Sequence, residues 1–371
     1  MVCQEFYEGF QVSNMCTDQA IAELLEHACP SIQYRIHSEI LGQSASSQKM
    51  VDLQNQILQD PNVKEVIEWQ QPDGWLAWNF HGAKSIEAGI RILCEKGVRR
   101  HHPVLAQALQ ALDRYPDRLE RGIGKVGKIL DEKGFGGSQM IRAAVFAYAG
   151  IEHKACVTEQ VNAALAGFKS VQAVNSVEDL AEEYQDKLVF KPDARWPSIY
   201  HLRLLAFTHG WRTAENRKMI TEAITRLVKL SPLPGISVRH KSQVIAPASF
   251  CLHDFNPKLE SMDAAHWMMW FHRMECLARL GVVNSIPALR RQVNVLAHML
   301  DAEGRFTRKI AHPYFTNWGA YTGLMLETNW RKPERRIYDL TFRSLLILHS
   351  GGDYAQKNTR TRTPNSLIHR R

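Results

Sequence analysis

The chain has 371 residues, of which 45% are hydrophobic and 23% are charged, as in ordinary soluble globular proteins, and this excludes a disordered, collagen-like or fibrous body. The formal net charge is +8, but residues 354–371 contain five basic side chains and no acid, so the other 353 residues carry only +3. That weak charge argues against DNA or RNA binding by the body of the chain.

Membrane and disulfide-rich classes are also disfavoured. No window approaches the ~18 uninterrupted apolar residues of a membrane helix, and Glu5 and Glu8 stand where a signal peptide would carry basic residues and an apolar run. The seven cysteines are scattered and include no Cys-x-x-Cys pair, so we expect reduced thiols. The sequence thus predicts a soluble, cytoplasmic protein without a membrane span.

Helical periodicity dominates the chain. Apolar residues recur at intervals of three and four in nearly every patterned segment and almost never alternate, which predicts an all-α protein. Proline favours the first helical position and glycine the position after the last, so many helix ends are recognisable. In chain order the expected helices cover 32–41, 62–69, 85–96, a segment starting at 103, 198–208, 264–280 and 334–349.

These helices form an irregular repeat. Four segments share an apolar helix, a glycine and a second helix with a polar face: 83–115, 138–168, 196–230 and 264–300. A fifth segment, 318–349, has the same form without the glycine. The four glycines are 53, 60 and 71 residues apart, so the units are not consensus copies.

A second recurring motif combines an acidic residue, a glycine and an aromatic residue. It occurs as Asp73-Gly74-Trp75, as Asp131 followed by Gly134-Phe135, and as Asp301 followed by Gly304 and Phe306. We expect tight turns in which the acid caps, the glycine takes a positive φ and the aromatic ring fills the layer between helices.

These residues resemble a known family. The runs YRIHSEILG, DPNVKEVIEWQQPDGW and EAGIRILCEKGV are similar to the squalene-cyclase-type repeat proteins of bacteria, which share paired helices and Gln-x-x-Asp-Gly-x-Trp turns with terpenoid cyclases and protein prenyltransferase β subunits. Here Trp75 directly follows Gly74 instead of standing two places on. The resemblance implies an α/α toroid, with inner helices around a central cavity. We assign residues 1–60 to an N-terminal helical cap, 61–350 to the toroid and 351–371 to a basic, disordered tail.

The catalytic motifs of that superfamily are missing. The chain has neither the Asp-x-Asp-Asp acid of protonating cyclases nor any Asp-Asp pair to hold magnesium. Protein prenyltransferases hold zinc with Asp, Cys and His, and the resemblance points to Cys251, His253 and Asp263 as a zinc site. Asp263 and His266, three residues apart on one helix face, are the candidate catalytic pair. The alternative is that Asp263 is a first-turn acid that complements the helix dipole.

Aromatic and histidine side chains gather at the predicted starts of inner helices. If these starts line one end of a toroid, the rings form an apolar cup suited to an isoprenoid. The alternative is that large rings simply fill layers between helices. The candidate substrate-binding residues are Trp78, His81, Trp196, Tyr200, Trp267, Trp270, Trp318 and Tyr321.

Two functions therefore remain open. The first is a cyclase-like or prenyltransferase-like isomerase or transferase that acts on an apolar, isoprenoid-type molecule in a central cavity. The second is a non-catalytic toroid that binds a hydrophobic ligand or a protein partner. A pocket lined by the tryptophans would favour the enzyme, and a centre filled by side chains would favour the binding protein.

Overall fold

A computed structural model describes residues 14–351 of the chain. Helices dominate it, as the periodicity predicted, and two short hairpins are added. The strands are β1 (Ala181–Tyr184), β2 (Lys187–Phe190), β3 (Val238–His240) and β4 (Gln243–Ile245). The α-helices are α1 (Asn14–His27), α2 (Pro30–Arg35), α3 (Gln48–Ile57), α4 (Pro61–Glu68), α5 (Ile86–Glu95), α6 (Pro103–Arg114), α7 (Lys125–Glu132), α8 (Ser138–Tyr148), α9 (Ala155–Val171), α10 (Val177–Leu180), α11 (Ile199–Ala206), α12 (Ala214–Leu230), α13 (Ala264–Leu280), α14 (Pro287–His298), α15 (Pro313–Thr316) and α16 (Pro333–Gly351).

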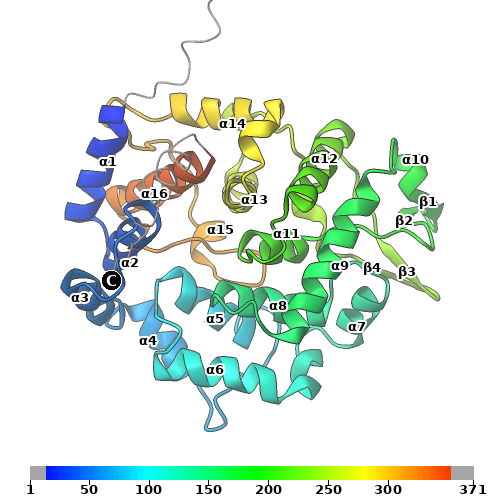
Figure 1. The fold of residues 1–371 in the computed structure, drawn as a ribbon, viewed down its shortest axis with the longest axis horizontal. Coiled ribbons are helices and arrows are strands. Elements are labelled where there is room, and N and C mark those ends of the chain that lie inside the picture. The colour runs from blue at the N-terminus through cyan, green and yellow to red at the C-terminus, as the bar shows by residue number, and fades with distance from the viewer. Residues whose placement is uncertain (1–13, 352–371) are drawn as a thin grey trace, which may run out of the picture.

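The first helices of the four repeat units pack on one another in chain order. Helix α5 contacts α8, α8 contacts α11, α11 contacts α13, and α13 contacts α16. Helix α16 in turn contacts the π-helical turn Ile36–Ile40 that continues α2. Arg35, at the end of α2, forms an ion pair with Glu95, at the end of α5, so the series of contacts returns to its beginning. These helices surround α15 in Figure 1.

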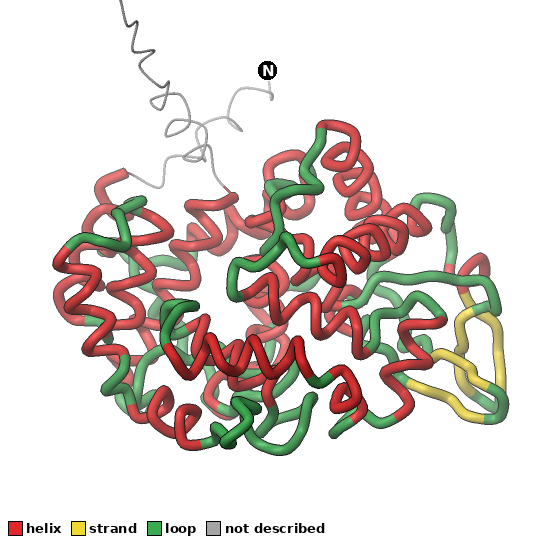
Figure 2. The backbone as a smooth tube through the Cα atoms, turned by 60° about the horizontal axis from the view of Figure 1, so that its bottom comes forward, coloured by secondary structure: helices red, strands yellow, loops and turns green. Residues whose placement is uncertain are grey.

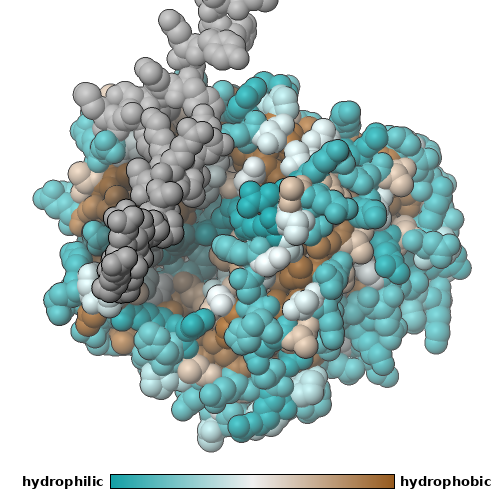
Figure 3. Space-filling view, viewed as in Figure 1, coloured by the Kyte–Doolittle hydropathy of each residue, from teal (hydrophilic) through white to brown (hydrophobic). Residues whose placement is uncertain are grey.

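The second helices lie outside the first. Helix α6 packs on α5, α9 on α8 and on α11, α12 on α9, and α14 on α16. In Figure 1, α6 and α14 lie at opposite edges of the molecule, whereas α7, α10 and the strands lie outside α9, and Figure 3 shows mainly hydrophilic residues along the edge formed by α6. The predicted pairing of an apolar helix with a second helix is therefore confirmed for the units of α5 and α8, whereas α12 and α14 pack mainly on α9 and α16, which belong to neighbouring units.

The three acid-glycine-aromatic turns are also confirmed. The Asp73 carboxylate accepts the backbone N–H of Trp75 at 3.0 Å, and Asp301 accepts those of Glu303 and Arg305. Gly74, Gly134 and Gly304 have φ values of 88°, 78° and 76°. The rings that follow them, Trp75, Phe135 and Phe306, are buried in the core.

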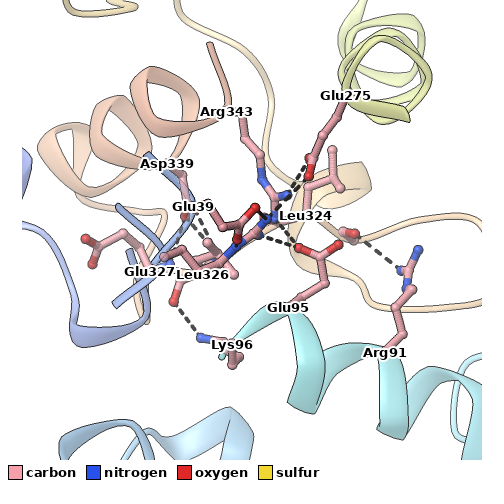
Figure 4. Close-up of polar contacts among 12 residues, drawn as sticks. Glu39, Arg91, Glu95, Lys96, Glu275, Leu324, Leu326, Glu327, Asp339 and Arg343 are labelled. Carbon is pink, nitrogen blue, oxygen red and sulfur yellow. Dashed lines mark hydrogen bonds and ion pairs between the residues drawn. The ribbon is translucent and has the colours of Figure 1, made fainter. Parts of the chain in front are cut away.

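A buried network of charges joins helices from the two ends of the chain (Figure 4). Arg343 of α16 forms ion pairs with Glu275 of α13 at 2.8 Å and with Glu95 of α5 at 3.0 Å. Arg35 lies 2.7 Å from Glu95 and 3.3 Å from Glu275. Its other partner is Glu39: burial alone would raise the pKa of this carboxyl, but Arg35 and Arg279 lower it to about 2. The network therefore binds the N-terminal segment to α5, α13 and α16, and residues 14–60 pack as part of the same body.

Two expectations from the sequence are wrong in detail. The hairpins β1–β2 and β3–β4, visible at one end of Figure 2, were not predicted. The segment 318–332, expected as the first helix of a fifth unit, has no helix, and α16 alone represents that unit. The basic tail lies outside the described residues apart from Gly351, the last residue of α16.

Within the described part of the chain, no helix combines the length and hydropathy needed to cross a membrane. The six cysteines from Cys16 to Cys276 are all free thiols there.

Candidate functional site

The predicted catalytic pair lies at the surface. Asp263 is the N-cap of α13, and its carboxylate accepts the backbone N–H of His266 at 2.9 Å. The same oxygen lies 2.8 Å from Nδ1 of His266, and the two side chains are 67% and 69% exposed. Hydrogen bonds from His266 lower the pKa of Asp263, as expected of an N-cap carboxylate. This geometry fits the alternative interpretation, in which Asp263 caps the N-terminus of α13.

The proposed zinc ligands do not form a metal site. Burial raises the pKa of the Cys251 thiol to about 12, which keeps it protonated and opposes its use as a thiolate ligand. His253 contacts the Ser249 hydroxyl at 3.1 Å, and burial lowers its pKa to about 4. Among residues 14–351, no three His, Cys, Asp or Glu side chains form a group that could hold a metal ion. These residues therefore do not fit zinc, and we derive no chemistry through it.

Three of the predicted substrate-binding tryptophans are core residues. Trp196, Trp267 and Trp270 are buried, and the Trp270 indole donates to the side chain of Gln292 at 2.8 Å. Trp267 packs edge-on against Trp270 and Phe306, with ring centroids about 5.5 Å apart. Two cavities, of about 510 and 280 Å³, are lined by none of the predicted aromatic residues. Packing between helices explains these three tryptophans.

Other predicted residues do come together. His81, Tyr200 and Tyr321 gather around Glu87, in the first turn of α5. We call these four residues the His81 site, and Trp318 lies beside it, against Arg91. Tyr200 lies in the first turn of α11, whereas Trp318 and Tyr321 belong to the irregular segment after α15.

A chain of hydrogen bonds connects the polar groups of the His81 site. The buried Glu87 carboxylate, 3% exposed, accepts the Tyr200 hydroxyl at 2.7 Å through Oε1. Its Oε2 lies 2.6 Å from Nδ1 of His81. Nε2 of His81 lies 3.4 Å from the Tyr321 hydroxyl, a long contact. Because an ionised carboxylate only accepts, Nδ1 must carry the proton and Nε2 is left as the basic nitrogen.

Burial keeps both phenols protonated. It raises the pKa of Tyr200 well above its usual value, and the adjacent Glu87 charge raises it further. Burial and Glu87 likewise raise the pKa of Tyr321 to about 12. The two tyrosines are therefore hydrogen-bond donors at neutral pH, and the imidazole of His81 is the base of the group.

Two buried arginines hold the segment that carries Tyr321. Arg91 of α5 donates to the backbone carbonyls of Gly319, Thr322 and Gly323. Its guanidinium also lies 5.0 Å from the ring centroid of Trp318. Arg203 of α11 donates to the carbonyl of Ala320 at 2.8 Å and to His272 at 3.0 Å. No carboxylate forms an ion pair with either arginine among the described residues, so backbone carbonyls take the place of an acid.

One exposed ring contacts the His81 site, and two more lie on adjoining segments. Phe250 is 43% exposed and meets Tyr321 at a centroid distance of 5.1 Å, nearly perpendicular to it. Trp78 is 64% exposed, and its ring is covered on one face by Arg121, whose backbone carbonyl also accepts the N–H of His81. Tyr314 is exposed as well, and its carbonyl accepts the N–H of Gly323. Polar groups beside apolar rings are the mixture of side chains that small-molecule sites use.

Sequence reasoning missed Glu87, Arg91 and Phe250. A signal was available for the first two, because they are charged residues one turn apart in the helix IEAGIRILCE, in which Glu95 at the end is the only other charged residue. No local pattern marks Phe250, which reaches the site by tertiary packing alone. No protein-family model, no curated protein and no solved structure matches this chain.

Proposed function

We propose that the chain is an α/α toroid that binds a small molecule with an apolar face at the His81 site and transfers a proton to or from it. The observation that carries this proposal is the hydrogen-bond chain from Tyr200 through Glu87 and His81 to Tyr321. A base oriented by a carboxylate is the arrangement that general acid–base catalysis requires. The closed series of packed helices supports the toroid architecture.

Each residue has a defined part in the reaction. Glu87 fixes the orientation and tautomer of His81, and Tyr200 holds Glu87. His81 Nε2 removes a proton from the ligand while the Tyr321 hydroxyl delivers one at a second position. The imidazolium then returns its proton to the Tyr321 oxygen, so the ligand is isomerised with no net change in atoms. Phe250 and Trp78 supply the apolar contact surface.

An isoprenoid remains the proposed substrate class, because exposed aromatic rings complement an unsaturated hydrocarbon. The ligand is bound near the surface, over Phe250 and Tyr321. The acid–base group replaces the absent Asp-rich motifs, and Asp263 and His266 have no part in the step.

One observation favours the non-catalytic alternative. The ion pairs of Arg343 and Arg35 fill the space between α5, α13 and α16, where a large substrate cavity was expected. A toroid filled in this way supports a protein that binds a hydrophobic ligand or a partner without changing it.

Solvent exchange separates these two functions. Farnesol and farnesyl diphosphate are incubated in D₂O with the wild-type protein and with His81→Asn and Trp196→Phe variants, and deuterium incorporation is followed by mass spectrometry. We expect incorporation with the wild type and Trp196→Phe and its loss with His81→Asn. Binding of either compound without any exchange would contradict the enzymatic proposal and support the alternative.

A further inference from the structure

A cleft of about 510 Å³, lined by both polar and apolar groups, lies where the N-terminal helices meet the segment before α16. It shares no lining residue with the His81 site. His27, Gln33 and Gln56 line it from α1, α2 and α3, and Glu327, Lys332 and Arg335 line it from the other side. Thr328 and Asn329 add a hydroxyl and an amide. Most of these groups are hydrogen-bond donors.

The floor of the cleft is rigidly built. The Glu327 side chain is 1% exposed, and its Oε1 accepts the backbone N–H of Cys29 at 2.7 Å. The backbone N–H groups of Leu326 and Glu327 both donate to the buried carboxylate of Asp339, at 2.9 Å. Lys96 donates to the carbonyl of Leu326 from beneath (Figure 4). Glu327 therefore has one fixed position, independent of any ligand.

Among the residues that line the cleft, Lys332 and Arg335 are cations and Glu327 is the acid. Lys332 has no acidic partner among the described residues, and Arg335 reaches Glu327 only at 3.4 Å. Arg335 also donates to the carbonyl of His27 at 2.9 Å, which fixes its guanidinium at the wall of the cleft. The cleft thus presents two cations, one of them positioned, together with amide and hydroxyl groups.

We propose that this cleft binds a small hydroxylated anion, such as a sugar that carries a phosphate, sulfate or carboxylate group. Lys332 and Arg335 bind the anionic group, since charge-assisted bonds from such donors are the strongest available to a protein. Gln33, Gln56 and Asn329 contact the hydroxyls. A 510 Å³ space is large enough for one sugar ring with its substituent.

Protonation of Glu327 regulates this site. Burial and the nearby charge of Asp339 raise the pKa of Glu327 to about 7, whereas the Cys29 N–H, Arg335 and Lys96 oppose that rise. Below this pH the carboxyl is neutral and no longer repels an anion. Its ion pair with Arg335 is lost, which leaves that guanidinium free to bind the ligand. If only the protonated form binds, about ten times more protein is competent at pH 6 than at pH 8, and the apparent Kd changes by the same factor. His27 also lines the cleft, so a variant at this position is the control for the role of Glu327.

Calorimetry with glucose 6-sulfate, whose charge is constant from pH 6 to 8, tests the proposal on the full-length protein. Uncharged glucose is the matched ligand. We expect wild-type binding about tenfold tighter at pH 6 than at pH 8, a loss of at least tenfold in Lys332→Ala, and no loss in Arg331→Ala, an exposed neighbour outside the cleft. Glu327→Gln should bind equally at both pH values, and His27→Gln should keep the pH dependence.

The result that overturns the site is equal affinity of Lys332→Ala and the wild type, binding of glucose as tight as that of its sulfate, or no binding to the wild type. A pH dependence that survives in Glu327→Gln overturns the regulatory role. The Lys332→Ala variant changes an exposed side chain, so this arm does not depend on whether the Glu327 variant folds.

Discussion

The hydroxyl of Tyr200 donates a 2.7 Å hydrogen bond to the buried carboxylate of Glu87, and this contact joins the first turns of α11 and α5 across 113 residues of sequence. It places the only acid of the His81 site at the junction of two helices that are buried on nearly every side. The contact therefore bears on stability as well as on the proposed chemistry.

We expect Tyr200→Phe to lower the free energy of unfolding by about 1.5–3 kcal/mol, the usual contribution of a hydrogen bond to a charged group. Urea denaturation measures this change. The matched control is Tyr314→Phe, which makes the same substitution at an exposed ring and should leave the unfolding free energy within about 0.5 kcal/mol of wild type. A similar loss in both variants would contradict a specific role for the Tyr200 hydroxyl.

The tautomer of His81 is a second testable consequence of Glu87. In the wild type, ¹⁵N NMR of the imidazole at neutral pH should find the proton on Nδ1, which faces Glu87 at 2.6 Å. Glu87→Gln can donate through its amide and should convert His81 to a mixture that includes the Nε2–H form. A His81 spectrum that is unchanged by this substitution would show that Glu87 does not orient the base.

Removal of a single charge from the buried ion pairs should strongly lower the free energy of unfolding. We expect Arg343→Met to cost about 3–5 kcal/mol, because it leaves Glu275 and Glu95 buried with one cation fewer. Arg290→Met, on the exposed face of α14, removes the same charge and should change stability by less than about 0.5 kcal/mol. Equal effects would indicate that net charge, and not the buried pairing, determines the result.

Glu327 gives the unfolding free energy a characteristic pH dependence. Its pKa rises on folding, from an ordinary glutamate value near 4.5 to about 7, so the folded state binds an extra proton between these values. The contribution of Glu327 to the free energy of unfolding is therefore greatest at low pH. It falls by up to about 3 kcal/mol as the pH rises from about 4.5 to 7. Thermal or urea denaturation of Glu327→Gln at pH 5 and pH 8 should lack this fall, and an unchanged fall would assign it to other groups.

Asp263 should behave as a helix cap. Asp263→Ala is expected to cost about 1 kcal/mol of stability, as at other N-caps. Plasma mass spectrometry with zinc in slight excess should find no stoichiometric zinc in the wild type or in the Asp263→Ala, His266→Ala double variant. Stoichiometric zinc that disappears in the double variant would instead restore the metal-site hypothesis.

The helices were predictable because their signals are local. Gly281 follows α13 with a φ of 75°, as its position after the last apolar residue predicted, and Pro61, Pro103 and Pro333 each begin a helix. The hairpins lacked such a signal. Their turns place Gln185, Asp186 and Lys241 at positive φ, where glycine or asparagine would have marked a hairpin.

The site was only partly predictable for a related reason. The aromatic pattern selected His81, Tyr200 and Tyr321, but it could not separate them from Trp196, Trp267 and Trp270, because burial of a ring depends on tertiary packing. Asp263 and His266 have the spacing of a functional pair, and that spacing equally suits a helix cap. The difference lies in solvent exposure, which one sequence does not encode locally.

The ion pair between Arg35 and Glu275 has a consequence for synthesis on the ribosome. Its two residues are 240 positions apart, so Arg35 cannot meet Glu275 until α13 has been made, and α1 packs against α16, which is made later still. Contacts of such sequence separation slow folding and leave unpaired surfaces in the meantime. A nascent chain that ends before α16 therefore holds Glu95 and Glu275 without Arg343, and it lacks the helix on which α1 and α13 pack.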